Sequence, residues 1–371
     1  MPKRIHRMLI VFLLVAVAAA AAGVVRVQGF GAGSQDEATL NAGLPAAEYG
    51  YHPDEDGSWG ESWSVQCVNE AGDNIVALMS ISNYHPLHKF GGTVDLFYYP
   101  ASGEKFEGHA EVKNDNVSAN RNGVKVNIGG NRFSGNHPNY RWQTEVEGLA
   151  LDLTFTAETP SLQLGQRKIL FGDRGDRYWN LTVLGPRASV KGTITANGRK
   201  IPYEGRAYFD HGWSTYKLYE FSQRWHVLRM MQDDFSFNLI EMVFRENFRP
   251  KRTQAIYITL GDKIIANSGA VKLTPTGAYK HAPSGLTLPQ SYRLHYEAGG
   301  TKLTGTVRMV KLVEGLNALD RLSPLLRKVI QTLVTDPWQF RFAGEADLTL
   351  VHNGQTRKIT GLTGGEVHHY K

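Results

Sequence analysis

The feature that most constrains the fold is a long series of short apolar segments, each ended by turn-forming residues. From residue 61 onwards the chain contains SWSVQCVN, NIVALMSISNY, GTVDLFYYP, FEGHAEVKN and GVKVNIGGNRFSG, separated by turns such as EAGDN, NYHP and YPASGE. The segments are rich in β-branched and aromatic residues or alternate apolar with polar positions, which is typical of strands. Their short spacing predicts antiparallel hairpins, and therefore a mainly β protein built as a sandwich or a barrel.

Two Asn-Gly dipeptides predict how the longest strands pair. Asn-Gly suits the type I′ turn of a two-residue hairpin, so ANGR at residues 196–199 predicts that ASVKGTITA pairs with KIPYEGRAYFD. HNGQ at residues 352–355 predicts a second such hairpin. Each half of the chain also opens on a strand that contains tryptophan. We therefore expect two similar β domains, at residues 51–213 and 214–371.

One segment near the C-terminus breaks the strand pattern. Its apolar residues recur at spacings of three and four, at Leu316, Leu319, Leu322, Leu326, Val329, Ile330 and Leu333. This spacing predicts an amphipathic helix, and Ser323 before Pro324 predicts a fresh helix start. We expect the helix to plug or flank a barrel. The alternatives are a lid, or a membrane-surface helix whose basic residues are Arg321, Arg327 and Lys328.

The N-terminus differs in composition from the rest of the chain. MPKRIHRM is basic, and LIVFLLVAVAAAAAGVV, from Leu9 to Val25, carries no charge. Residues 1–26 are therefore interpreted as a signal peptide or an N-terminal membrane anchor. Either interpretation places the folded part in the periplasm, in the medium or on the outer face of the cytoplasmic membrane. Residues 27–50 are small, polar and rich in Gly and Ala, and we expect a flexible tether there.

Charge and cysteine content exclude two classes of protein. Four basic residues of the leader account for four of the six net positive charges. The rest of the chain is therefore near neutral, and its charge does not indicate nucleic-acid binding. Cys67 is the only cysteine of the sequence, so an intramolecular disulfide is impossible. HPLH at residues 85–88 has a two-ligand spacing but no obvious third ligand, and is interpreted as a loop pair. We expect no metal and no cofactor.

The motif GRAYFDHGWST, at residues 205–215, carries the candidate chemistry. In a strand, Tyr208 and Asp210 share one face, while His211 and Trp213 share the other. Asp210 and His211 therefore do not form a simple catalytic dyad. Burial among aromatic groups raises the pKa of a carboxyl group, and a neutral aspartic acid can donate a proton. The alternative is structural: Asp210 and His211 satisfy backbone groups at a domain junction.

The YFDHGW stretch, together with Trp63, VLGPRASVKGTI and the closing FAGEADLTL and GLTGGEVHHY, resembles the AttH-like and carotenoid 1,2-hydratase (hydroxyneurosporene synthase) family. The resemblance covers most of the chain after about residue 50 and implies two lipocalin-like antiparallel β-barrels. In the hydratases, a Tyr and an Asp two residues apart are implicated in protonating a double bond, and Tyr208 and Asp210 match them. A His-x-Trp pair of the hydratases is matched by Arg177 and Trp179, with arginine in place of histidine.

Two functions follow from this resemblance and from the residues. The first is an exported protein that binds a hydrophobic small molecule, a lipid or an isoprenoid. The alternative is a hydratase or isomerase acting on a C=C bond of an isoprenoid-like substrate, with Asp210 as general acid and Tyr208 positioning it. A scaffold with barrels filled by side chains is the remaining interpretation. The expected ligand-binding residues are Trp179, Trp213, His211, Arg177, Trp63 and Trp225.

Overall fold

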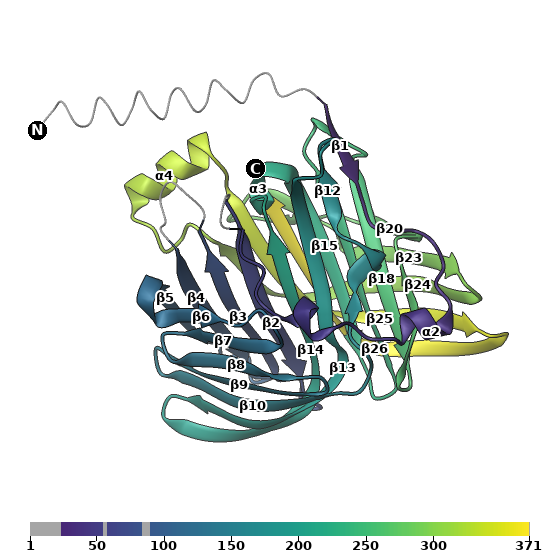
Figure 1. Ribbon diagram of the computed structural model, residues 1–371, viewed down its shortest axis with the longest axis horizontal. Coiled ribbons are helices and arrows are strands. Elements are labelled where there is room, and N and C mark those ends of the chain that lie inside the picture. The colour runs from purple at the N-terminus through teal and green to yellow at the C-terminus, as the bar shows by residue number, and fades with distance from the viewer. Residues whose placement is uncertain (1–23, 55–57, 84–89, 371) are drawn as a thin grey trace, which may run out of the picture.

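Two large antiparallel sheets dominate the computed structural model, which describes residues 24–54, 58–83 and 90–370 (Figure 1). The predicted mainly β fold is confirmed. The helical segments of the described part are short: α2 (Glu37–Leu40), α3 (Leu218–Phe221), α4 (Pro324–Leu333) and the 3-10 turns η2 (Ala46–Tyr49), η3 (Asn114–Asn116) and η4 (Leu164–Gln166). Within the described residues, no helix has the length and apolar character needed to cross a membrane.

The first sheet curls into a near-closed barrel along the strand order β5-β4-β3-β2-β14-β13-β10-β9-β8-β7-β6. These strands are β2 (Gly60–Val68), β3 (Asn74–Ser82), β4 (Gly91–Tyr99), β5 (Phe106–Lys113), β6 (Val117–Ala119), β7 (Val124–Ile128), β8 (Asn131–Asn136), β9 (Asn139–Val146), β10 (Leu149–Ala157), β13 (Arg177–Ala196) and β14 (Arg199–Ser214). Where the ladder is open, the His109 backbone N–H donates to Glu147 Oε2 at 3.0 Å. This bond links β5 to the turn between β9 and β10.

The second sheet is a half-barrel with the strand order β19-β18-β16-β15-β26-β25-β24-β23-β20. Its strands are β15 (Ser222–Met231), β16 (Phe235–Phe244), β18 (Arg252–Leu260), β19 (Lys263–Ser268), β20 (Val271–Thr276), β23 (Ser291–Ala298), β24 (Thr301–Asn317), β25 (Pro337–His352) and β26 (Gln355–Tyr370). A separate hairpin pairs β21 (Tyr279–His281) with β22 (Leu286–Leu288). The exact boundary between the two predicted domains stays a prediction.

Both Asn-Gly hairpins are confirmed. Ala196 pairs with Arg199 across one turn, and His352 pairs with Gln355 across the other. Asn197 and Asn353 both have a positive φ, of 50° and 49°, as a type I′ turn requires. These turns therefore set the register of β13 with β14, and of β25 with β26.

The predicted C-terminal helix is only partly correct. α4 begins at Pro324 with Ser323 as its N-cap residue, as expected. The periodic residue Leu316, however, lies in strand β24, where it pairs with Gln339. Pairing with the long strand β25 outweighs the local helical spacing at this end. None of the residues of α4 is buried, so the helix does not plug a barrel.

Residues 27–50, which we expected to form a flexible tether, pack against the folded part. Strand β1 (Val25–Gln28) pairs with β12 (Ile169–Phe171) and also with β17 (Phe248–Arg249), while β11 (Leu162–Gln163) and β12 pair with β13. Val27 and Phe30 are buried between the sheets. The predicted leader falls mostly on residues 1–23, which lie outside the described residues, as does the HPLH segment.

Buried apolar side chains form three cores. One fills the first barrel and includes Trp63 and Phe209, and another lines the second sheet. The third lies between the sheets and includes Trp179, Tyr208 and Phe244. A shared core of this kind joins the two sheets through apolar contact as well as through the chain.

Candidate functional site

Strand β14 presents the two halves of the YFDHGW motif to different environments, as the alternation predicts. Phe209 belongs to the core of the first barrel, and the His211 ring stacks on Trp63 there, with ring centroids 4.5 Å apart. Tyr208 belongs to the core between the sheets. Asp210 lies on the same face as Tyr208, and both carboxylate oxygens are bound from that side. The acidic part of the motif therefore faces the second sheet.

Tyr208 and Asp210 are brought together. The Tyr208 hydroxyl donates to Asp210 Oδ2 at 2.6 Å, and Ser64 Oγ donates to Asp210 Oδ1 at 2.5 Å. Asn238 Nδ2, from the second sheet, donates to the Tyr208 oxygen at 3.1 Å. Burial raises the pKa of Asp210, although the charge of Arg229 and the bonds from Ser64 and Tyr208 act in the opposite direction. The predicted raised pKa is confirmed in direction and in cause.

Arg229 covers this pair from the second sheet. Its guanidinium lies over the Tyr208 ring, 4.6 Å from the centroid, and Arg229 Nη1 donates to Gln66 Oε1 at 2.8 Å. The same nitrogen lies 3.4 Å from Glu366 Oε1. Burial alone would raise the pKa of Glu366. The hydrogen bond from His368 and the positive charge of Arg229 outweigh it and hold this pKa well below its usual value of 4.5. Arg229 and Glu366 thus form an ion pair whose side chains are 11% and 12% exposed.

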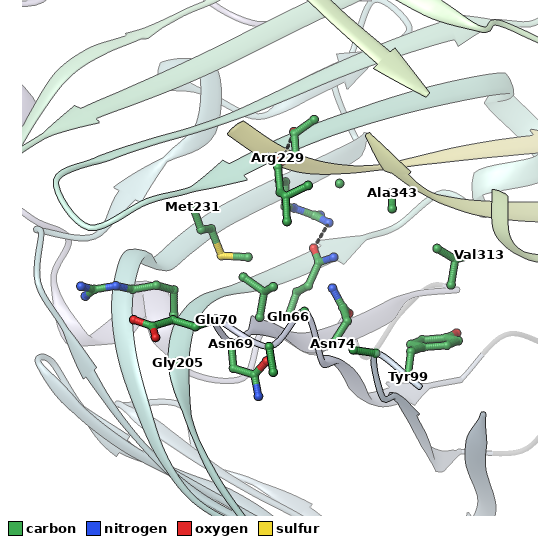
Figure 2. A pocket seen from close by; sticks show the side chains of 18 of the residues that line it. Gln66, Asn69, Glu70, Asn74, Tyr99, Gly205, Arg229, Met231, Val313 and Ala343 are labelled. Atoms are coloured by element: carbon green, nitrogen blue, oxygen red, sulfur yellow. Dashed lines mark hydrogen bonds between the residues drawn. The ribbon is translucent and has the colours of Figure 1, made fainter. Parts of the chain in front are cut away.

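A cavity of about 1030 Å³ opens in front of Arg229 (Figure 2). The first sheet contributes Gln66 and Val68 from β2 and Tyr99 from β4 to its wall. The second sheet contributes Arg229 and Met231 from β15, Val313 from β24, Arg341, Phe342 and Ala343 from β25, and Glu366 from β26. The cavity therefore lies between the two sheets, whereas the interior of the first barrel is filled by its own core.

A second polar network closes the cavity at the Tyr99 wall. Arg341 Nη1 donates to the Tyr99 hydroxyl at 2.8 Å and to Glu314 Oε2 at 2.9 Å. The Tyr99 hydroxyl donates to the same carboxylate oxygen at 2.5 Å. Lys105 also pairs with Glu314. All three side chains of the Tyr99–Arg341–Glu314 network are buried, so its charges are compensated within the protein.

The tryptophans expected to bind ligand lie outside the cavity wall. Trp179 packs edge-on against Phe30 and Trp225, with centroids 6.1 and 6.0 Å apart. Trp213 stacks on His52 at 3.9 Å. Arg177 is exposed and lies over the Tyr216 ring, at 4.7 Å. Gly205 and Arg206 of the motif line the cavity directly. Arg229, which contacts Tyr208, and Gln66 connect the Tyr208–Asp210 pair to it. The proposed roles of the other residues stay predictions.

Sequence reasoning missed the polar residues that line the cavity. Arg229, Arg341 and Glu366 each stand in an apolar or glycine-rich strand segment, VLRMM, FRFAG and GGEVHHY. A single charged residue inside such a strand is a signal, because an unpaired charge at a little-exposed position is costly. The sequence alone does not show which charge pairs with which, since the partners are far apart along the chain.

Comparisons with known proteins agree with this architecture. The AttH-like family model matches residues 102–312. A solved structure from Nitrosomonas europaea, assigned to AttH, is 14% identical, with a TM-score of 0.56 over 87% of this chain and 98% of that one. Kievitone hydratase from Nectria haematococca is 14% identical, with a TM-score of 0.56 over 92% and 97%. CghA in complex with Sch210972 is 11% identical, with a TM-score of 0.57 over 93% and 98%. At these identities the structures share the fold, and a comparison with curated proteins finds no match.

Proposed function

The chain belongs to the AttH-like family, and we propose that it binds a hydrophobic small molecule, of the lipid or isoprenoid class, in the cavity between its two sheets. The observation that carries the proposal is the cavity itself, with a volume of about 1030 Å³. Binding sites for small molecules generally fall between about 300 and 1,000 Å³, so the cavity is large enough for an extended or polycyclic molecule.

The composition of the wall supports an apolar ligand with a polar end. Val68, Met231, Val313 and Phe342 offer apolar surface. Arg229 and Gln66 stand at one place in the wall, already bonded to each other, and can orient a polar group of the ligand. Apolar surface combined with placed polar groups is the usual composition of such sites, and charged side chains such as Lys191 and Glu204 also line this wall. The shared fold adds support, because one solved relative is a complex with Sch210972.

A hydratase or isomerase is the second candidate. The observation that favours it is the Tyr208–Asp210 pair, held at 2.6 Å directly beneath Arg229. In this proposal Asp210 protonates a C=C bond of an isoprenoid-like substrate, and Tyr208 positions the carboxyl group. Arg229 lies on the cavity side of Tyr208 and has to move for substrate to reach Asp210. One relative with the same fold is named a hydratase.

The variant Asp210→Asn distinguishes the two functions. Asparagine keeps the shape of the side chain and can still bond Ser64 and Tyr208, so we expect the fold and the binding of ligand to remain unchanged. Wild type and variant, loaded with the same apolar molecule, are extracted and compared by mass spectrometry. The binding function predicts that both return the molecule unaltered. Hydrated or rearranged product from wild type, and none from the variant, would instead establish Asp210 as a general acid.

We also propose that the folded part lies outside the cytoplasm, in the periplasm, in the medium or on the outer face of the cytoplasmic membrane. The support is the basic start and the uncharged run from Leu9 to Val25. Fractionation of cells that produce the full chain tests this, with recovery in the cytoplasmic fraction as the contradicting result. Membrane association through the N-terminal segment predicts that the chain sediments with membranes.

A further inference from the structure

We propose that His52, Glu61 and His211 bind a divalent transition-metal ion, with zinc as the best match, at a site separate from the cavity. One ligand atom from each residue, two ring nitrogens and a carboxylate oxygen, all lie within 4.8 Å of one another. Two imidazoles and one carboxylate form a ligand set that zinc accepts, with a water molecule completing four-coordinate geometry. His52 and Glu61 are nine residues apart, but His211 lies 150 residues beyond Glu61, which explains why no metal motif was visible in the sequence.

The hydrogen bonds of His211 orient it as a ligand. Its Nδ1 lies 3.3 Å from the Glu48 carbonyl oxygen, and its Nε2 lies 2.6 Å from Glu61 Oε1. A neutral imidazole has one N–H and cannot donate to both oxygens. If Nδ1 donates to the carbonyl, Nε2 presents its lone pair toward the carboxylate. A protonated ring donates to both oxygens, whereas a bound cation takes the place of the direct contact between Nε2 and Glu61. A backbone carbonyl on the other ring nitrogen is a common feature of metal-binding histidines.

His52 supplies an independent indication. Its Nδ1 is buried and forms no well-aligned hydrogen bond, and it lies 3.4 Å from Glu61 Oε1, with which it pairs when the ring is protonated. A buried polar atom without a hydrogen-bond partner is rare and calls for an explanation, of which a bound ion is one. The Nδ1 of His52 points to the same carboxylate oxygen as His211 Nε2. Both histidines thus converge on one oxygen atom.

The three side chains are held in place by their surroundings. The His52 ring stacks on Trp213 with an interplanar angle of 2°, and the His211 ring stacks on Trp63 with an angle of 5°. The His52 backbone N–H donates to both oxygens of Glu61, each at 3.0 Å. Zinc–ligand distances of about 2.0–2.2 Å require the imidazole of His211 to withdraw slightly from Glu61 and His52 to approach.

The exposed part of the His52 side chain offers a metal ion a route into the site. The side chains of Glu61 and His211 are fully buried, whereas that of His52 is 25% exposed. A metal ion would therefore enter past the His52 ring, whose Nδ1 is itself buried. His211 and Asp210 point to opposite faces of β14, so the proposed ion lies on the barrel side and the cavity on the other. The metal site thus stands independently of the proposed ligand function.

Metal titration of the full chain tests the proposal. Chain stripped with a chelator is titrated with Zn²⁺ against a chromogenic competitor, and with Co²⁺, whose visible absorption reports tetrahedral coordination. We expect a single ion per chain, and roughly tenfold or greater loss of affinity in His52→Gln, because one of three protein ligands is removed. Circular dichroism confirms that the variant is folded. The matched control is His295→Gln, since His295 is exposed and pairs with a neighbouring carboxylate, Glu297.

Two results would overturn the site. The first is absence of stoichiometric Zn²⁺ binding by wild type. The second is equal Zn²⁺ affinity of wild type, His52→Gln and His295→Gln, which would identify an adventitious ion only. An intact tetrahedral Co²⁺ spectrum in wild type that is lost in His52→Gln and kept in His295→Gln supports the proposal.

Discussion

Replacing Arg229 with methionine is expected to lower the free energy of unfolding by about 3 kcal/mol, because it removes the guanidinium beside the buried Glu366 carboxylate, which keeps its bonds from His368 and Gln339. Arg229 Nη1 lies 3.4 Å from Glu366 Oε1 and donates to Gln66 Oε1, and both charged side chains are about one-tenth exposed. Removing one member of a buried pair costs about 3–5 kcal/mol, since the other charge stays desolvated. Urea denaturation of wild type and variant gives the difference directly.

Two further variants isolate the cause of this loss. In Arg229→Met/Glu366→Gln the unpaired charge is gone, so the double variant is expected to regain at least half of the lost stability. The matched surface control is Arg141→Met, because Arg141 pairs with Asp152 at 2.9 Å but both side chains are about half exposed. Exposed pairs contribute about 0–1 kcal/mol. If Arg229→Met and Arg141→Met lower the free energy of unfolding equally, the Arg229–Glu366 pair contributes no more stability than an exposed pair.

The same pair makes the expected difference depend on pH. In the folded protein burial raises the pKa of Glu366, but the bond from His368 and the charge of Arg229 together hold it below its usual value of 4.5, and Arg229→Met removes the second of these. A lowered pKa contributes stability that is fully present above 4.5 and is lost as the pH falls toward the folded-state pKa. The stability gap between wild type and Arg229→Met is therefore expected to be full at neutral pH and to narrow below 4.5. A gap that widens on acidification would contradict the assignment of Glu366 as the partner.

Replacing Ala343 with tryptophan is expected to weaken the binding of apolar molecules roughly tenfold or more, which corresponds to about 1.4 kcal/mol. Ala343 is an exposed residue of β25 that lines the cavity wall (Figure 2), so an indole at this position occupies space that the ligand requires. Binding is measured by the fluorescence of Nile red, a neutral apolar dye, and by its displacement with a long-chain fatty acid.

The control for this experiment is Thr274→Trp. Thr274 is exposed on β20, away from the cavity wall, so it adds the same indole to the surface without narrowing the cavity. We expect this variant to bind Nile red like wild type. If both tryptophan variants bind like wild type, the dye is held elsewhere and the cavity is not the binding site.

How far the sequence predicts the molecule depends on the range of the interactions involved. The hairpin at Asn197 and the two faces of β14 were predictable, because a turn type and the strand period are local properties. Leu316 shows the limit: its spacing favours a helix, yet pairing with Gln339 of β25 places it in a strand. Phe30 shows a second limit of prediction from sequence. Its small polar neighbours suggest a flexible tether, yet its own side chain is buried between the sheets.

The cavity could not be predicted in the same way. Its polar wall joins Gln66 of β2 to Arg229 of β15, residues 163 positions apart in the chain. No local pattern shows that the outer face of one barrel meets a strand of the second sheet. The motif itself was a good guide to the chemistry of Tyr208 and Asp210, which bond as their shared face predicts, but it did not reveal Arg229 in front of them.

The most direct test of the central proposal is the identification of what the protein carries. Protein purified from its native source is extracted with organic solvent and the extract is analysed by mass spectrometry, alongside protein carrying Ala343→Trp. We predict a discrete apolar molecule, of the lipid or isoprenoid class, in near-stoichiometric amount from wild type and at a strongly reduced amount from the variant. An extract without such a molecule, followed by failure of the stripped protein to take up any of the apolar compounds offered to it, would contradict a ligand-binding function.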